Sequence, residues 1–115
     1  MKAMMSYVDT GSGFPVFLGH SYLFDKSMWS PQIEHLAQHF RVIAPDLWGH
    51  GDSPALPAST ASMADLAADH LALMDALQID EFAVVGLSVG GMWGPELAVA
   101  APQRVKALML FDSFV

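Results

Sequence analysis

The stretch Gly86-Leu87-Ser88-Val89-Gly90 places one serine hydroxyl between two glycines, after an apolar run and before a helix-like pattern. A sharp strand-to-helix turn strains the serine backbone, and side chains at Gly86 and Gly90 would collide with adjacent chain. The following helix directs its N-terminal N–H groups toward the same place, which favours developing negative charge. The pattern therefore predicts a nucleophilic Ser88. A structural helix cap is the alternative, and a phosphate-binding loop is disfavoured because no Lys follows the glycines.

Strands and helices alternate along the chain, as is needed to place such a turn at the end of a sheet. Ser30 is expected to cap a helix with Pro31 at its first position, and Ser62 with Asp65 resembles a capping box. Pro95 should kink or loosen the helix after Ser88. The expected strands are 4–8 (weak), 16–18, 41–44, 81–85 and 105–111, and the expected helices are 30–40, 63–77 and 90–101. This order predicts an α/β fold with a four-stranded parallel β-sheet core and flanking helices, in which the strand before Ser88 is interior.

The composition indicates a globular protein. Of 115 residues, 53% are apolar and 15% are charged, and the net charge is −7. Five scattered Lys and Arg residues cannot form a phosphate-binding face, which argues against nucleic acid as a partner. The chain has no cysteine, so disulfides and thiolate metal sites are excluded. No apolar run is long enough for a signal peptide or a membrane span, so we expect a cytoplasmic protein that does not contact the membrane.

Three motifs occur in one order: GHSYLFDKSMWSPQ (19–32), PDLWGHGDS (45–53) and GLSVGG (86–91). They resemble the oxyanion loop, the Asp-x-x-Gly-x-Gly-x-Ser loop and the nucleophile elbow of the α/β-hydrolase family. The first motif is most similar to the small esterase and perhydrolase branch of that family. The resemblance covers essentially the whole chain. It implies that residues 1–115 are the N-terminal part of a single α/β-hydrolase domain, an incomplete fold lacking its C-terminal strands.

The resemblance also implies a role for each matching residue. Ser88 would be the nucleophile, between the elbow glycines Gly86 and Gly90. The backbone N–H groups of Val89 and Tyr22 would form the oxyanion hole. Ser21 stands where the family has a glycine after the loop histidine. The resemblance implies no metal and no organic cofactor, and Trp48 is expected to pack rather than to bind.

The general base is missing from this set of residues. The family order is Ser, then acid, then His, but no histidine follows Ser88. We expect structural or exposed roles for the five histidines that precede it, which are His20, His35, His39, His50 and His70. Asp112 ends the last strand and is a candidate acid, although an Asp at this place is often structural. The catalytic His is therefore expected outside this chain, and the isolated chain should be inactive or nearly so.

The last strand would be left as an exposed apolar edge, which invites pairing with another chain. We expect the missing C-terminal part of the hydrolase or a second copy of the chain to cover Val105 to Phe111. Whether the chain is a truncation, one piece of a nicked enzyme or a fragment that dimerises stays open.

Two functions remain open. The first is a carboxylesterase that hydrolyses small esters through an acyl-serine intermediate, with C–C cleavage, peracid formation and lactone hydrolysis as other chemistries of the same elbow. The second is a non-catalytic α/β-hydrolase-like module that binds a small ligand or a partner protein. The missing histidine favours the second function, whereas the elbow glycines and the oxyanion loop favour the first.

Overall fold

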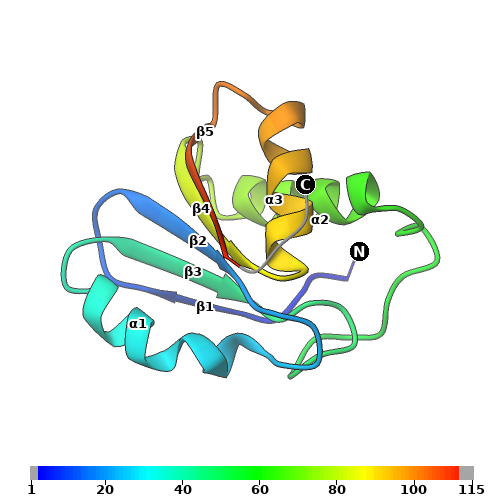
Figure 1. Cartoon of the computed structure of the whole chain (residues 1–115), viewed down its shortest axis with the longest axis horizontal. Helices are drawn as coiled ribbons and strands as arrows, with labels where there is room; N and C mark the ends of the chain where they lie inside the picture. The colour runs from blue at the N-terminus through cyan, green and yellow to red at the C-terminus, as the bar shows by residue number, and fades with distance from the viewer. Residues whose placement is uncertain (1–2, 112–115) are drawn as a thin grey trace.

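The computed structural model describes residues 3–111, which form one five-stranded sheet of order β1-β3-β2-β4-β5 (Figure 1). Strands β3, β2, β4 and β5 run parallel to one another, and β1 runs antiparallel to β3. The predicted parallel core is thus confirmed, with β4 interior between β2 and β5. The strand bounds are β1 (Tyr7–Thr10), β2 (Pro15–Gly19), β3 (Arg41–Pro45), β4 (Phe82–Leu87) and β5 (Val105–Phe111).

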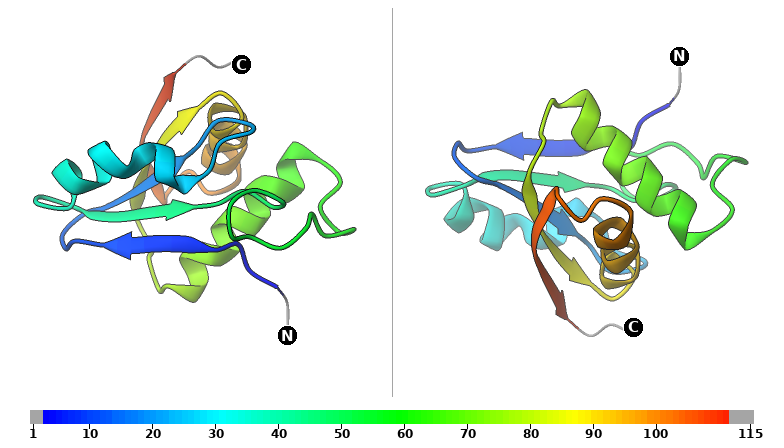
Figure 2. Two further views of the ribbon diagram at one scale, coloured as in Figure 1. Left: turned by 90° about the horizontal axis from the view of Figure 1, so that it is seen from below. Right: turned by 90° about the horizontal axis from the view of Figure 1, so that it is seen from above.

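The helices cover both faces of the sheet, with α1 (Ser30–Leu36) on one face and α2 (Met63–Ala76) and α3 (Gly90–Ala100) on the other (Figures 1 and 2). Successive residues of β2 supply the two cores, because side chains alternate across a strand. Phe17 packs in the core under α2 and α3. Val16 and Leu18 pack in the core under α1. Strand β2 is therefore buried on both faces, as an interior parallel strand requires.

Two local predictions at the N-terminal half are wrong. The first strand is Tyr7–Thr10 rather than 4–8, because it forms where it pairs with β3, and the Arg41 guanidinium binds the Asp9 carboxylate across this pair at 2.8 Å. Ser30 does not cap α1, which begins at Ser30 and ends at Leu36. A short 3-10 helix, η1 (Lys26–Trp29), precedes α1, and the Asp25 carboxylate caps it by accepting the Ser27 N–H at 2.8 Å.

The predicted start of α2 is confirmed. The Ser62 hydroxyl accepts the N–H of Asp65 at 3.0 Å, and the Asp65 carboxylate accepts the N–H of Ala61 at 3.0 Å. This reciprocal capping satisfies donors that the helix itself cannot satisfy. Helix α3 contains Pro95 as predicted, and a kink at this proline stays a prediction. Within residues 3–111, no helix is both long and apolar enough to cross a membrane, and the cytoplasmic location stays a prediction.

Candidate active site

Ser88 lies on the turn between β4 and α3, at the carboxyl end of the parallel strands. Its φ of 55° is in the left-handed region, which an L-residue other than glycine rarely adopts. Val89 is already in the helical region with φ −61° and ψ −32°, and α3 begins at Gly90. The predicted strained turn at the end of the sheet is therefore present. Such strain persists only where surrounding structure enforces it.

A close approach of α3 to β2 enforces this turn. A Cβ atom on Gly90 would lie 2.4 Å from the carbonyl oxygen of Gly19, and one on Gly19 would lie 2.9 Å from the Cα of Gly90. The two glycines therefore allow the first turn of the helix to touch the end of the neighbouring strand. Gly86 is buried and lies opposite Gly19 in β2 and Leu110 in β5. The predicted collision of a side chain at Gly86 stays a prediction.

The loop after β2 carries the second predicted oxyanion residue, Tyr22, which is 62% exposed. Ser21 does not adopt a positive φ, so the serine that replaces the family's glycine is not strained there, whereas Leu23 has φ 70°. Among the turn and loop hydrogen bonds of the described residues, none uses the N–H of Tyr22 or of Val89. Both groups can therefore donate to a ligand.

His20 holds the beginning of this loop and is fully buried. Its Nε2 accepts the N–H of Leu47 at 2.9 Å, so Nδ1 carries the proton and donates to the carbonyl oxygen of Ser21 at 2.8 Å. Burial lowers the pKa of His20, and the neighbouring His50 lowers it further. The ring is thus a neutral link between the loops after β2 and β3. This agrees with the structural role expected for it.

Asp46 makes a second link between the same two loops, and its side chain is completely buried. Its carboxylate accepts the backbone N–H and the ammonium of Lys26, at 2.7 and 2.6 Å, and the N–H of Asp52 at 2.9 Å. Burial alone would raise the pKa of this carboxyl, but these hydrogen bonds hold the pKa below its ordinary value. A side chain on Gly51 would collide with the carboxylate. The sequence motif contained these residues, but nothing in their spacing indicated the contact with Lys26.

The two predicted oxyanion residues line one pocket of about 390 Å³. The loop after β2 contributes Tyr22, the elbow contributes Val89, and α2 contributes Leu66. The rest of its wall comes from the loop after β3. These further lining residues are Leu47, Trp48, Gly49, His50 and Leu56. The pocket is mostly apolar, which is the composition expected of a small-molecule site, and convergence of the two N–H groups on it stays a prediction. Leu56 and Leu66 were not among the predicted site residues, since isolated apolar residues carry no sequence signal for a pocket.

His50 and His70 each have a ring nitrogen within hydrogen-bonding distance of a backbone carbonyl oxygen. His50 Nδ1 lies 2.9 Å from the carbonyl oxygen of Trp48, and its ring contacts Tyr22 edge-on, with centroids 5.2 Å apart. His70 Nδ1 lies 2.8 Å from the carbonyl oxygen of Leu66. The candidate acid Asp112 lies outside the described residues. The N–H of Ser88 donates to the carbonyl oxygen of Phe111 at 3.0 Å, so the elbow is linked to the end of β5.

Comparisons with known proteins identify relatives of this arrangement. The model of one protein family, described as the alpha/beta hydrolase fold, matches residues 14–114. The chain is 34% identical over 112 residues to a putative carbamate hydrolase of Azorhizobium caulinodans. This match covers 97% of this chain and 42% of that protein. It is 35% identical over 103 residues to a pimeloyl-(acyl-carrier protein) methyl ester esterase of Legionella pneumophila, covering 90% of this chain and 39% of that protein.

A solved structure agrees with these matches. The thermophilic esterase from Thermogutta terrifontis superposes with a TM-score of 0.89 at 37% sequence identity, covering 96% of this chain and 40% of the esterase. The chain therefore spans about two fifths of the length of these relatives.

Proposed function

This chain belongs to the α/β-hydrolase family, and from that premise we propose that it is the nucleophile-bearing part of a serine carboxylesterase that acts on small esters. The observation that carries the proposal is the left-handed backbone of Ser88 at the junction of β4 and α3. A strained nucleophile turn of this type projects the hydroxyl from the end of the sheet. A serine that only capped a helix would need no such strain, because capping residues are typically extended.

The reaction we propose begins with attack of the Ser88 hydroxyl oxygen on the ester carbonyl carbon. The hydroxyl proton passes to a general base, and the carbonyl oxygen becomes negatively charged. The N–H groups of Val89 and Tyr22 donate to this oxyanion, helped by the N-terminus of α3. The intermediate expels the alcohol, which takes the proton from the base and leaves an acyl-serine. Water then hydrolyses the acyl-serine by the same steps.

The base is not supplied by this chain in the proposed mechanism. No histidine follows Ser88 in the sequence, and both ring nitrogens of the buried His20 are engaged by the backbone. The histidine would come from the part of a hydrolase that this chain does not contain. Asp112, or an acid in that same part, would orient it.

A non-catalytic binding module is the second candidate function. In that case the pocket of about 390 Å³ would bind a small ligand without acyl transfer. The two candidates differ in one measurable property, which is whether Ser88 becomes acylated.

Acylation of Ser88 is tested with nitrophenyl acetate and intact-protein mass spectrometry, on the 115-residue chain alone and on the chain completed by the C-terminal part of a hydrolase. The chain alone should turn over the ester roughly a million-fold more slowly than the completed protein, since it has no base. In the completed protein, Ser88→Ala should abolish acyl-enzyme formation.

Ser59→Ala, which removes an exposed loop serine, is the matched control and should acylate normally. Acylation that persists in Ser88→Ala would refute the nucleophile. Enzyme-like turnover by the 115-residue chain alone would instead show that one of its own histidines is the base.

A further inference from the structure

Two pockets of the molecule are both lined by Trp48. The candidate active-site pocket, of about 390 Å³, is lined by Trp48 together with Leu66 of α2. A second pocket, of about 310 Å³, is lined by Trp48 together with Asp69 and Leu73 of the same helix. Trp48 is only 6% exposed, and both pockets are also lined by residues of α2.

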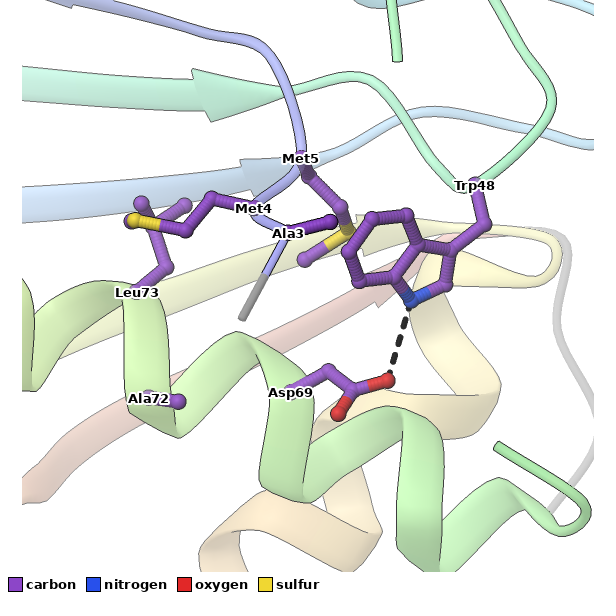
Figure 3. Close-up of a pocket in the computed structure, with 7 residues that line it drawn as sticks. All are labelled: Ala3, Met4, Met5, Trp48, Asp69, Ala72 and Leu73. Atoms are coloured by element: carbon purple, nitrogen blue, oxygen red, sulfur yellow. Dashed lines mark hydrogen bonds between the residues drawn. The ribbon is translucent and has the colours of Figure 1, made fainter. Parts of the chain in front are cut away.

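The second pocket is lined mainly by hydrocarbon and thioether groups (Figure 3). The segment before β1 contributes Ala3, Met4 and Met5, and α2 contributes Ala72 and Leu73 beside the carboxylate of Asp69. Its volume is at the lower end of the range for small-molecule pockets. A flexible apolar chain matches this lining, because a charged or polar group would lose its hydration with few partners to replace it.

The indole is fixed in place by a hydrogen-bonded group. Its Nε1–H donates to Asp69 Oδ2 at 2.9 Å, the contact drawn in Figure 3. The Thr60 hydroxyl donates to the same oxygen, and the Thr60 residue is itself buried. Helix α2 therefore holds the indole N–H through Asp69, and Thr60 holds the same carboxylate oxygen. A buried tryptophan with its N–H satisfied has a defined orientation, which makes it a firm wall rather than a mobile one.

We propose that Trp48 determines the length of the acyl chain that the candidate active site accepts. This inference rests on the proposed function, because it needs the acyl group of an ester bound at Ser88. A short acyl chain extends from Ser88 into the first pocket and ends against the indole. A longer chain finds further apolar space only behind the indole. Removal of the indole joins the two pockets and moves the limit to longer chains.

The test is calorimetric titration of the 115-residue chain with sodium alkanoates from butanoate to dodecanoate. In the unsubstituted chain each added methylene should tighten binding about fourfold until the alkyl chain reaches Trp48, after which binding should gain nothing. In Trp48→Ala the gain should continue over several further methylenes. Trp29→Ala is the matched control, because Trp29 is also buried but packs with Val16 under α1 and lines neither pocket. In Trp29→Ala, the alkyl length beyond which affinity stops rising should be the same as in the unsubstituted chain.

Three results would overturn the proposal. The first is no alkanoate binding to the unsubstituted chain, and the second is an unchanged limiting alkyl length in Trp48→Ala. The third is an equal increase of the limiting alkyl length in Trp29→Ala. If Trp48→Ala does not fold, Trp48→Phe with methyl-labelled methionine decides by NMR. Decanoate should then shift the Met5 methyl signal in Trp48→Phe and leave it unchanged in the unsubstituted chain, and any other pattern contradicts the wall.

The proposed function and this inference fail separately. Alkanoate binding requires no acyl transfer, so Ser88→Ala should keep the whole binding series. If no acyl-enzyme forms but the limiting alkyl length still depends on Trp48, the esterase function is rejected and Trp48 is retained as the end of the alkyl-binding pocket. If Ser88 is acylated normally but affinity shows no limiting alkyl length, the esterase function is retained and the role of Trp48 is rejected.

Discussion

His70 is a fully buried histidine that the proposed reaction does not use. Its ring stacks on the indole of Trp93, with centroids 3.7 Å apart, and contacts the ring of Phe17 at 5.6 Å. Nδ1 donates to the carbonyl oxygen of Leu66, and Nε2 has no hydrogen-bond partner among the described residues. A second proton on this ring would therefore be buried without an acceptor. Burial lowers the pKa of His70 to about 4, although the nearby Asp69 raises it slightly.

The stability of the chain should depend on pH through this residue. The unfolded chain binds the proton with a pKa of about 6.5, and the folded chain binds it only near 4, so acid favours unfolding. The stabilisation that comes from keeping His70 neutral is complete above pH 6.5. As the pH falls toward 4 it is lost, and the free energy of unfolding decreases by up to ~1.4 kcal/mol per pH unit. His70→Phe keeps an aromatic ring against Trp93 and should flatten the slope over this window, measured by urea unfolding between pH 4 and 7.5.

His39→Phe is the control, because His39 is exposed and its replacement should leave the slope unchanged. Part of the slope should survive in His70→Phe, since burial also lowers the pKa of His20. An unchanged slope in His70→Phe would contradict the prediction.

At the scale of the elements, the contact between α3 and β2 determines where Ser88 stands. Gly90 and Gly19 bring the helix and the strand into backbone contact, and Trp93 of α3 packs over the same glycine of β2. Helix α3 thus begins directly at the end of the neighbouring strand. Val89, the residue just before α3, lines the same pocket as Tyr22 of the loop after β2.

Gly90→Ala should lower the free energy of unfolding by about 2 kcal/mol or more, because its methyl group would meet a backbone carbonyl that cannot move aside. Gly94→Ala is the matched control in the same helix. There the nearest atom is Leu108 Cδ1 at 3.1 Å, a flexible side-chain end, and the gain in helix propensity offsets the crowding. Urea midpoints of both variants give the comparison. Equal losses would mean that the contact with Gly19 is not special.

At the scale of the whole molecule, β5 is an edge of the sheet in the described part of the chain (Figure 2). It pairs with β4 on one side, and Met109 and Phe111 are 54% and 47% exposed. Lys106 binds Glu81 of the adjoining segment at 3.0 Å rather than standing free on the edge. An apolar edge with so little charge is a site for strand addition.

We therefore propose that the chain does not act as an isolated monomer. The natural occupant of the β5 edge is the remainder of a hydrolase, since the relatives are more than twice as long as this chain. A second copy of the chain is the alternative. Size-exclusion chromatography with light scattering should give a dimer or larger species for the 115-residue chain, and a shift to a one-to-one complex when the C-terminal part is added. A stable, non-aggregating monomer would refute the proposal.

The sequence by itself determined the features that local chain geometry encodes. The alternating apolar patterns predicted the parallel core and the position of β4, because side-chain period depends only on the backbone conformation of each element. The elbow around Ser88 was predictable because it too depends only on residues that are close together in the sequence. A glycine on each side of one serine, after a strand and before a helix, describes a turn within five residues.

Only the tertiary structure decided which distant residues meet. Three contacts leave no periodic signal in the sequence, because each joins residues 20 or more positions apart. They are the link from Asp46 to Lys26, the link from Trp48 to Asp69 and the stack of His70 on Trp93. The bounds of β1 also depended on its partner, because a strand extends only where β3 offers a hydrogen-bonding edge. Each contact forms because folding brings separate segments of the chain together, and among these residues Trp48 lines the candidate active-site pocket.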